Sequence, residues 1–273
     1  MDVKKLFDVA GKTAVITGGT GILGGEMARG LAQAGARVVV LGRNKANGES
    51  LQKELRDAGQ EALFVQADVL DEKQLLQAKE TILAAYGSID ILVNSAGGNM
   101  SGAVIMPQQS FFDLDMNAFA QVVDLNLTGT VLPTKVFCDD MTKRGKGVIV
   151  NIASMASFRP ITRVVGYGAA KSGIVNFTGW LAIELARKFG EGVRVNGIAP
   201  GFFVTEQNRS LLTNPDGSYT ERGADVIRNT PFKRFGEPDE LIGTLLWLCS
   251  DASRFVTGVT IPVDGGFNVY CGV

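Results

Sequence analysis

Apolar residues gather along the chain in seven short, nearly continuous runs. The runs are rich in β-branched residues, which is typical of strands that are buried on both faces. They comprise residues 13–17, 37–41, 62–65, 90–93, 147–152, 193–198 and 259–263.

The segments between these runs have the period of amphipathic helices. Leu23, Met27 and Leu31 share one helical face, for example. Buried strands that alternate with helices predict an α/β fold, a Rossmann-like doubly wound parallel sheet of about seven strands with helices on both faces. No linker, charge block or repeat divides residues 1–273, so one domain is expected.

Two stretches lack a clear period. Residues 97–114 are expected to form a loop, and residues 202–237 an irregular excursion with two short helices that serves as a substrate loop. Long connections in a compact domain are often lids or binding loops.

The composition excludes several classes of function. The net charge is −1 and no basic stripe occurs, which gives nucleic-acid binding little support. No window approaches the ~18 consecutive apolar residues of a membrane span, and the N-terminus lacks the pattern of a signal peptide. The three cysteines match no disulfide or metal motif, so a cytoplasmic location is expected. Because the chain contains no histidine, every mechanism with imidazole as base or ligand is excluded, and no metal site is expected.

A strand, a glycine-rich turn and a helix follow one another in "TAVITGGTGILGGEMARGLA", residues 13–32. A helix N-terminus offers unpaired N–H groups and a positive dipole end, and glycines let a pyrophosphate approach the backbone. The alternative is a tight turn that needs glycine only for a positive φ. The candidate contacts to a dinucleotide are Gly18, Thr20, Ile22 and Leu23.

The end of the second strand, in "VVVLGRNK" (38–45), should select the cofactor. An acid there would bind the ribose hydroxyls and favour NAD. This chain has Gly42, followed by Arg43 and Asn44, which leaves room and positive charge for a 2′-phosphate. NADP(H) is therefore the preferred cofactor, with NAD(H) possible. The alternative is that Arg43 stacks on the adenine or faces solvent.

Four further segments fall where strands should end, at the carboxyl edge of the sheet where open α/β folds bind ligands. They are "ADV" (67–69), "NSAGG" (94–98), "NIAS" (151–154) and "APGFFVTE" (199–206). Each alone also fits ordinary turn chemistry. Their candidate cofactor contacts are Asp68, Val69, Asn94, Ala96, Gly97, Pro200, Gly201, Phe203 and Thr205, and Asp68 can accept from an adenine amine.

The chain resembles the short-chain dehydrogenase/reductase family over essentially its whole length. The matching pieces are "TGGTGILG" (17–24), "NSAG" (94–97), Asn126 in "LNL", Ser154, "YGAAK" (167–171), "PGFFVT" (200–205) and "VDGG" (263–266). The resemblance implies hydride transfer with a nicotinamide cofactor. One position departs from the family pattern: Ile22 replaces the second of three glycines, so a shifted or slightly widened turn is expected.

Tyr167 and Lys171 lie one helical turn apart, and this spacing has a chemical reason. A free tyrosine has a pKa near 10 and is a poor base unless it is tuned. A neighbouring ammonium favours the phenolate, as does the positive nicotinamide of an oxidised cofactor. A lowering of the pKa of Tyr167 by about two to three units, or roughly 3–4 kcal/mol, is therefore expected.

The family's pattern implies a catalytic tetrad of Asn126, Ser154, Tyr167 and Lys171. By this resemblance Tyr167 and Lys171 also contact the cofactor, with Lys171 on the nicotinamide ribose. Ser154 binds the substrate oxygen, and Asn126 holds a water that links Lys171 to solvent.

A polar and cationic set surrounds these positions and predicts the substrate. The candidate substrate contacts are Asn99, Ser154, Met155, Arg159, Arg163 and Asn208, with Gln207 and Arg209 nearby. Arginine can hold a carboxylate in a bidentate fork, so a small polyhydroxylated acid such as a hexuronate or ketogluconate is expected. The alternative is that these arginines are solvated or lie at a subunit interface.

Within the family, the chain is most similar to sugar-acid oxidoreductases of the fructuronate reductase (D-mannonate oxidoreductase) or gluconate 5-dehydrogenase type. Two alternatives stay open, a 3-oxoacyl-carrier-protein reductase and a dinucleotide-sensing protein without turnover. The resemblance also implies a homotetramer, for which "FTGWLAIEL" (177–185) and "LLWLC" (245–249) are apolar enough to form interfaces or core.

Overall fold

The computed structural model describes residues 2–205 and 208–272 and contains one parallel sheet of seven strands in the order β3-β2-β1-β4-β5-β6-β7. This confirms the predicted fold class. The strands are β1 (Thr13–Thr17), β2 (Arg37–Gly42), β3 (Ala62–Gln66), β4 (Ile91–Asn94), β5 (Gly147–Ile152), β6 (Val193–Pro200) and β7 (Thr260–Val263). Each predicted run coincides with a strand to within two residues.

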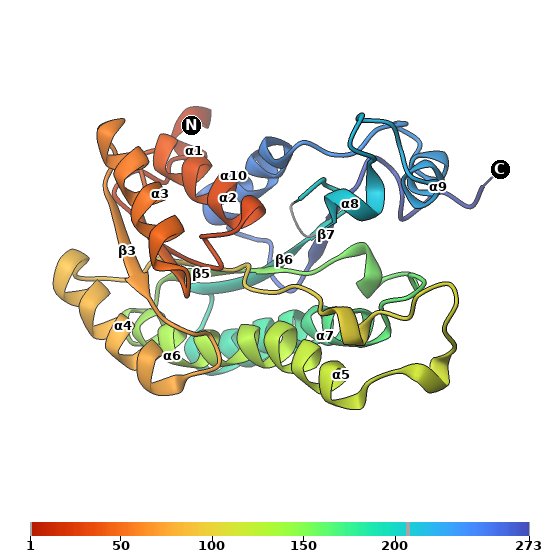
Figure 1. Ribbon diagram of the computed structural model, residues 1–273. Coiled ribbons are helices and arrows are strands. Elements are labelled where there is room, and N and C mark those ends of the chain that lie inside the picture. The colour runs from red at the N-terminus through yellow and green to blue at the C-terminus, as the bar shows by residue number, and fades with distance from the viewer. Residues whose placement is uncertain (1, 206–207, 273) are drawn as a thin grey trace.

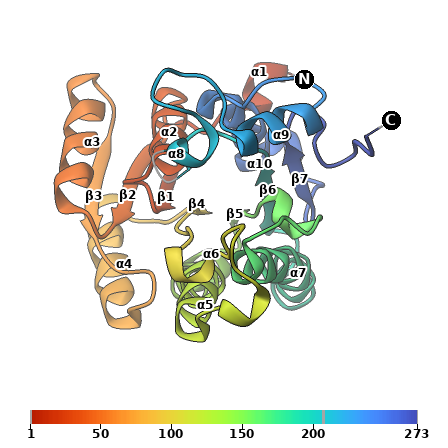
Figure 2. The same ribbon diagram turned by 45° about the vertical axis from the view of Figure 1, so that its right-hand side comes forward.

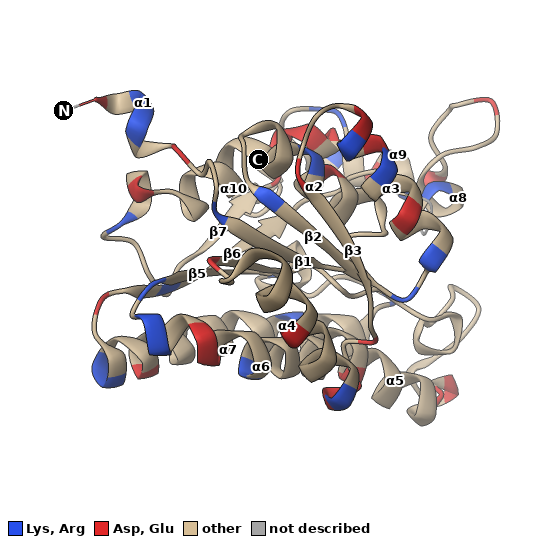
Figure 3. Cartoon of the chain, turned by 90° about the vertical axis from the view of Figure 1, so that its left-hand side faces the viewer, with Lys and Arg blue, Asp and Glu red and all other residues tan. Residues whose placement is uncertain are grey.

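Helices cover both faces of the sheet (Figure 1). Those above it in this view are α1 (Val3–Leu6), α2 (Ile22–Gln33), α3 (Lys45–Asp57) and α10 (Ile242–Cys249), and those below it are α4 (Glu72–Tyr86), α5 (Met116–Val123), α6 (Gly129–Arg144) and α7 (Val165–Phe189). Figure 3 shows acids and bases of both signs interspersed over the two helical layers, without a basic stripe.

Two apolar cores lie on the two faces of the sheet. One includes Met27 and Leu31 of α2 and Leu245 of α10, and the other includes Phe137 of α6 and Leu185 of α7. Strands such as β1 and β5 are buried along their whole length because helices cover both faces, which explains why their sequences are continuous rather than alternating.

The strand order reverses beside β1, which lies between β2 and β4. Thr17, Asn94 and Asn151 align in register where β1, β4 and β5 end. Because all strands are parallel, the polar segments that follow them converge on this one edge, which is the usual ligand site of such sheets.

Two long connections lie at this edge. Residues 97–114 are largely irregular, with short 3-10 helices at Ser101–Ala103 and Phe111–Asp113. The excursion at 202–237 carries α8 (Arg209–Leu212) and α9 (Glu221–Asn229). Figure 2 shows α9 above the green segment that leads into α7. Within the described chain, no helix combines the length and the apolar character that a bilayer crossing requires.

Candidate active site

Lys171 lies in the second turn of α7 and is almost completely buried, with 4% of its surface exposed. Its Nζ donates a hydrogen bond to the carbonyl oxygen of Ile152 at 2.7 Å and lies 5.6 Å from the ring centroid of Tyr167. Burial lowers the pKa of the Lys171 ammonium to about 8, because a charged group loses hydration there. The lysine and the tyrosine therefore meet as their spacing predicts.

Tyr167 is half-buried, and burial raises the pKa of its phenol above the ordinary value. The hydroxyl of Ser154, which hydrogen-bonds with the phenol, lowers the pKa by a smaller amount. The expectation of a lowered pKa is therefore wrong for the protein on its own. The reason is that loss of hydration outweighs the stabilisation that neighbours give to the phenolate.

Ser154 follows β5 and is fixed by a small network that joins it to α7. It is the N-cap of the short 3-10 helix Met155–Ser157, and its Oγ accepts a hydrogen bond from the backbone N–H of Ala156 at 3.2 Å. The hydroxyl of Ser157 accepts from the Ser154 N–H at 3.3 Å and donates to the Lys171 carbonyl oxygen at 2.8 Å. Ser157 thus links the Ser154 segment to the Lys171 turn of α7.

Asn126 lies in a π-helical turn, Asp124–Thr128, between α5 and α6, and it is fully buried. Its Nδ2 donates to the carbonyl oxygens of Gly98 and Val122 at 2.7 and 2.8 Å, and its Oδ1 accepts from the Gly98 N–H at 3.2 Å. A Cβ on Gly97 would lie 2.6 Å from this Oδ1 and 3.4 Å from Lys171 Nζ. Gly97 is therefore required where Asn126 and Lys171 meet.

The glycine turn after β1 is tight. Gly18 has a φ of +66°, and a Cβ there would lie 2.7 Å from the Cα of Ala96. A Cβ on Gly24 would lie 2.3 Å from the Gly18 carbonyl oxygen. The Gly21 N–H donates to that same oxygen at 3.0 Å, and Ile22 becomes the first residue of α2.

The first turn of α2 fits a phosphate. Its N-cap, Gly21, has no side chain that could accept from the first N–H groups. The first N–H groups of α2 therefore have no capping side chain and are available to an anion at the carboxyl edge of the sheet.

The expected adenosine end of the site lies between β2 and β3. A Cβ on Gly42 would lie 2.8 Å from Thr20 Oγ1, so the predicted contact Thr20 lies beside the position expected to select the cofactor. Arg43 is exposed, and its Nη1 lies 3.7 Å from a carboxylate oxygen of Asp68. Asn44 caps α3, because its side chain accepts from the Asn47 N–H at 3.0 Å. Asn44 Oδ1 therefore serves as the N-cap acceptor of α3.

Asn94 belongs to a buried polar network rather than to the surface of the site. It is 1% exposed, and its Nδ2 donates to Thr134 Oγ1 at 2.8 Å and to Asn151 Oδ1 at 2.9 Å. Asn151 in turn donates to Thr178 Oγ1 on α7 at 2.9 Å. The Asn94 side chain thus ties β4 and β5 to the helices beneath the tetrad. Val69 is likewise buried, at 6% exposure.

The segment after β6 lies close to the end of β7. A Cβ on Gly201, which follows Pro200, would lie 2.7 Å from the Cα of Asp264, so glycine is needed for this approach. Phe203 is 4% exposed and packs in the core with its ring against Gly236. Only its backbone is therefore placed to reach a cofactor. Thr205 follows, and its N–H donates to Asn208 Oδ1 at 2.7 Å.

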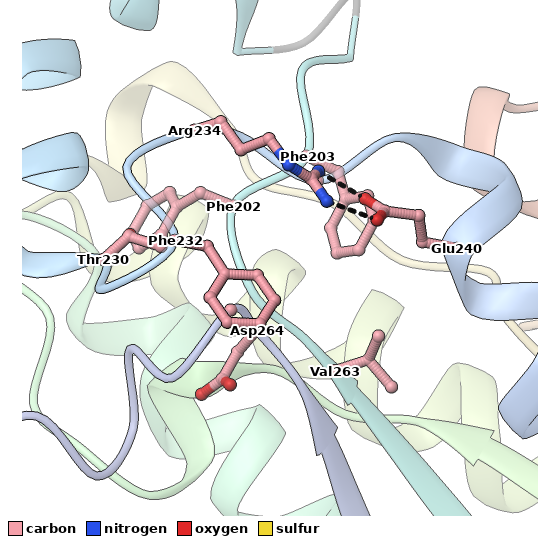
Figure 4. A pocket seen from close by; sticks show the side chains of 10 residues that line it. Phe202, Phe203, Thr230, Phe232, Arg234, Glu240, Val263 and Asp264 are labelled. Atoms are coloured by element: carbon pink, nitrogen blue, oxygen red, sulfur yellow. Dashed lines mark hydrogen bonds and ion pairs between the residues drawn. The ribbon is translucent and has the colours of Figure 1, made fainter.

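A small cavity lies behind this segment (Figure 4). Its volume is about 190 Å³, and Phe202, Phe203 and Phe232 supply aromatic walls. Arg234 lines it too, but both oxygens of Glu240 neutralise the guanidinium, at 2.7 and 2.6 Å. Asp264 also lines the cavity, and its carboxylate accepts from the backbone N–H groups of Gly266 and Asn268 at 2.9 and 2.6 Å. None of the tetrad residues lines the cavity.

Two of the predicted substrate contacts have other roles. Met155 is 1% exposed and packs with Ile174 and Ala199, so its side chain does not line the site. Arg159 Nη1 donates to the carbonyl oxygens of Phe267 and Tyr270, both at 2.9 Å, which holds the C-terminal segment. Both expectations are therefore wrong for these side chains.

Asn208 closes its own loop, since its Nδ2 donates to the Phe203 carbonyl oxygen at 2.9 Å in addition to the contact with Thr205. Gln207 lies outside the described residues. Asn99 and Arg163 stay at the rim, both partly exposed, and Arg163 immediately precedes the segment that enters α7.

Sequence reasoning missed two residues of this region. Ser157 was detectable in principle, because it stands at the third position after the capping residue Ser154. Arg222 on α9 reaches the same rim, with its Nη1 3.4 Å from Thr162 Oγ1. No spacing signal connects residues so far apart in the chain.

Comparison with known proteins now decides the family. Residues 12–216 match the model of the short chain dehydrogenases. The chain belongs to the short-chain dehydrogenase family. It is 48% identical to the uncharacterized oxidoreductase UxuB of Bacillus subtilis over 275 residues, which cover 97% of this chain and 98% of the relative.

Two crystal structures of the family are similar to the whole chain. One, provisionally assigned as a D-mannonate oxidoreductase from Haemophilus influenza with bound NAD, has a TM-score of 0.90 and 38% identity and covers 97% of this chain and 98% of its own. The other, a gluconate 5-dehydrogenase from Burkholderia cenocepacia in complex with NADP and tartrate, has a TM-score of 0.86 and 34% identity, with coverage of 97% and 98%. This chain is thus an oxidoreductase that acts on a carbonyl or alcohol with a nicotinamide cofactor.

Proposed function

We propose that this enzyme interconverts a ketone and a secondary alcohol on a small sugar acid, of the fructuronate/mannonate or the ketogluconate/gluconate kind. The observation that carries the chemistry is the buried Lys171 ammonium, 5.6 Å from the Tyr167 ring at the ligand edge of the sheet. The substrate class is supported by the two similar structures, which are described as a D-mannonate oxidoreductase and a gluconate 5-dehydrogenase.

The residues present fit a dinucleotide. The uncapped first turn of α2 would hold its pyrophosphate, and Gly18 keeps that turn close to Ala96. Lys171 would hold the nicotinamide ribose. The nicotinamide supplies or accepts the hydride when it is bound.

Tyr167 handles the proton. Because burial raises the pKa of its phenol, Tyr167 is protonated at neutral pH and can donate to the oxygen of a ketone as that ketone is reduced. The Ser154 hydroxyl would hold the same oxygen and stabilise its developing charge. Lys171, whose pKa is about 8, is positively charged at neutral pH and stabilises the phenolate that remains.

The proton returns to Tyr167 from solvent. We assign this path to Lys171 and to a water held near Asn126, which lies beside Lys171 across Gly97. In the oxidative direction the same groups act in reverse.

We favour NADP(H) over NAD(H) as the cofactor. Gly42 stands where an acid would select NAD, and the exposed guanidinium of Arg43 follows it. The pairing of Arg43 with Asp68 at 3.7 Å is exposed and therefore weak, so a 2′-phosphate could replace the carboxylate.

The proposal is tested by initial rates with sugar acids and neutral polyols, each with both cofactors, followed by the absorbance of the reduced nicotinamide. Turnover of fructuronate or a ketogluconate with NADPH is the expected result. Activity on neutral polyols with none on sugar acids would rule out the substrate class.

We also infer a homotetramer in the cytoplasm. Trp180 and Ile183 on α7 are 58% and 62% exposed, which suits a helix-to-helix interface. The second apolar segment, 245–249, contributes mainly to the core, because Leu245, Leu248 and Cys249 are fully buried. All three cysteines are unpaired, in keeping with a reducing compartment. Sedimentation equilibrium measures the subunit number directly.

A further inference from the structure

Two arginines from distant parts of the chain lie beside the segment that leads into α7. Arg163 lies just before α7, whose first turn carries Tyr167. Arg222 lies in the first turn of α9, is half-buried, and places its Nη1 3.4 Å from the hydroxyl of Thr162, the neighbour of Arg163. Figure 2 shows α9 above the green segment that leads into α7.

Among the described residues, neither guanidinium has an ion-pair partner. Within residues 2–205 and 208–272, no acid lies within ion-pair distance of Arg163 or Arg222. Asp225, three residues along α9 from Arg222, pairs instead with Arg228 at 3.0 Å.

The electrostatics at Arg222 are unfavourable for the protein alone. Burial lowers the pKa of its guanidinium, and the positive charge of Arg163 lowers it further, although Asp225 opposes this. Bringing two like charges together in a half-buried place is costly unless an anion joins them.

The backbone at Arg163 is strained in a way that fits a functional position. Its φ is +77°, a left-handed conformation that is unfavourable for a residue with a Cβ. A hydrogen bond from the Ile105 N–H to the Arg163 carbonyl oxygen, at 2.9 Å, holds this conformation. Such strain persists where the surrounding structure enforces it, often at ligand sites.

We propose that Arg163 and Arg222 together form a clamp for the carboxylate of the substrate, while Tyr167 and Ser154 hold its carbonyl end. This inference rests on the proposed function and names the residues that select an acid over a neutral sugar. Arg159, another cation expected at the site, is engaged by the C-terminal carbonyls and is not available for the anion. Two planar guanidinium groups can share one carboxylate through parallel hydrogen bonds.

The variant Arg222→Gln tests the clamp with two substrates that differ at one terminal carbon, a carboxylate in D-fructuronate and a hydroxymethyl group in D-fructose. The variant removes a charge-assisted hydrogen bond to the carboxylate of fructuronate. The kcat/KM with fructuronate should therefore fall by roughly 10- to 150-fold, mostly because KM rises. The kcat/KM with fructose and the affinity for NADPH should not change. The matched control is Arg228→Gln on the same helix, which removes an exposed cation already paired with Asp225 and should leave both substrates unaffected.

A binding measurement separates this inference from the proposed function. Calorimetric titration with tartrate should show a dissociation constant that Arg222→Gln raises by roughly the same factor. If no sugar acid is turned over but tartrate binding depends on Arg222, the proposed substrate class fails and the clamp stands. The clamp is overturned if the wild type does not bind tartrate, or if Arg222→Gln changes fructuronate and fructose kinetics equally or not at all.

Discussion

Replacing Lys171 with methionine should remove activity and stabilise the fold at the same time. Lys171 is 4% exposed, and burial lowers the pKa of its ammonium from 10.5 to about 8. At about 1.4 kcal/mol per pKa unit, this difference corresponds to a destabilisation of about 3 kcal/mol at pH 7. Methionine carries no charge but loses the hydrogen bond to the Ile152 carbonyl oxygen, worth about 1 kcal/mol. The free energy of unfolding should therefore rise by about 2 kcal/mol.

The pH dependence of this effect has a definite sign. The folded protein releases the Lys171 proton near pH 8, whereas the unfolded chain holds it to about pH 10.5. Between these values the unfolded state binds more protons, so the destabilising contribution of Lys171 shrinks as the pH rises. The advantage of Lys171→Met is thus largest below pH 8 and declines toward pH 10.5.

Urea unfolding at matched protein concentration, at pH 7 and near pH 9.5, measures this difference. The control is Lys188→Met on the same helix, where the lysine side chain is 62% exposed and pairs with Glu184. Its stability should differ from that of the wild type by less than about 0.5 kcal/mol at both pH values. The reasoning fails if Lys171→Met is less stable than the wild type at pH 7, or if its advantage is the same at both pH values.

Three further variants test other parts of the site. Ser154→Ala should lower kcat by about 10²–10³-fold, because it removes a hydrogen-bond donor to the substrate oxygen. The lost helix cap should reduce the free energy of unfolding by only about 1 kcal/mol. An unchanged kcat in steady-state assays would reject that role. Gly18→Ala should abolish NADPH binding measured by fluorescence, since the new Cβ would lie 2.7 Å from the Cα of Ala96. The control is Gly59→Ala, where φ is similar, at +79°, and the Cβ would meet open space, so this variant should bind NADPH normally. Arg43→Ala should raise KM for NADPH by roughly tenfold and leave KM for NADH unchanged; equal effects on both would show that Arg43 does not meet a 2′-phosphate.

The sheet was predictable from sequence because its strands are buried on both faces, which gives continuous apolar runs. Strand ends were less well defined. β6 continues through Pro200, which can end a strand at its carboxyl edge although it cannot donate to a neighbour. Tyr167, Lys171 and Ser154 were predicted as site residues because their spacing and their resemblance to a family agree, and the structure brings Lys171 close to Tyr167.

The positions of several side chains depend on tertiary contacts that the local sequence pattern does not predict. Arg159 turns to the C-terminal segment, and Met155, in the 3-10 helix that follows Ser154, turns into the core. Arg222 reaches Thr162 because α9 folds back over the sheet edge. The raised pKa of Tyr167 follows from burial, which sequence spacing does not reveal.

The role of Tyr167 is tested most directly by the rate of NADPH oxidation with fructuronate or a ketogluconate, for the wild type and for Tyr167→Phe. Phenylalanine keeps the ring and removes only the proton donor. Loss of about 10²–10⁴-fold in kcat, with NADPH affinity unchanged, is the predicted result. Equal turnover by the two proteins would contradict the assignment of Tyr167 as the group that donates the proton.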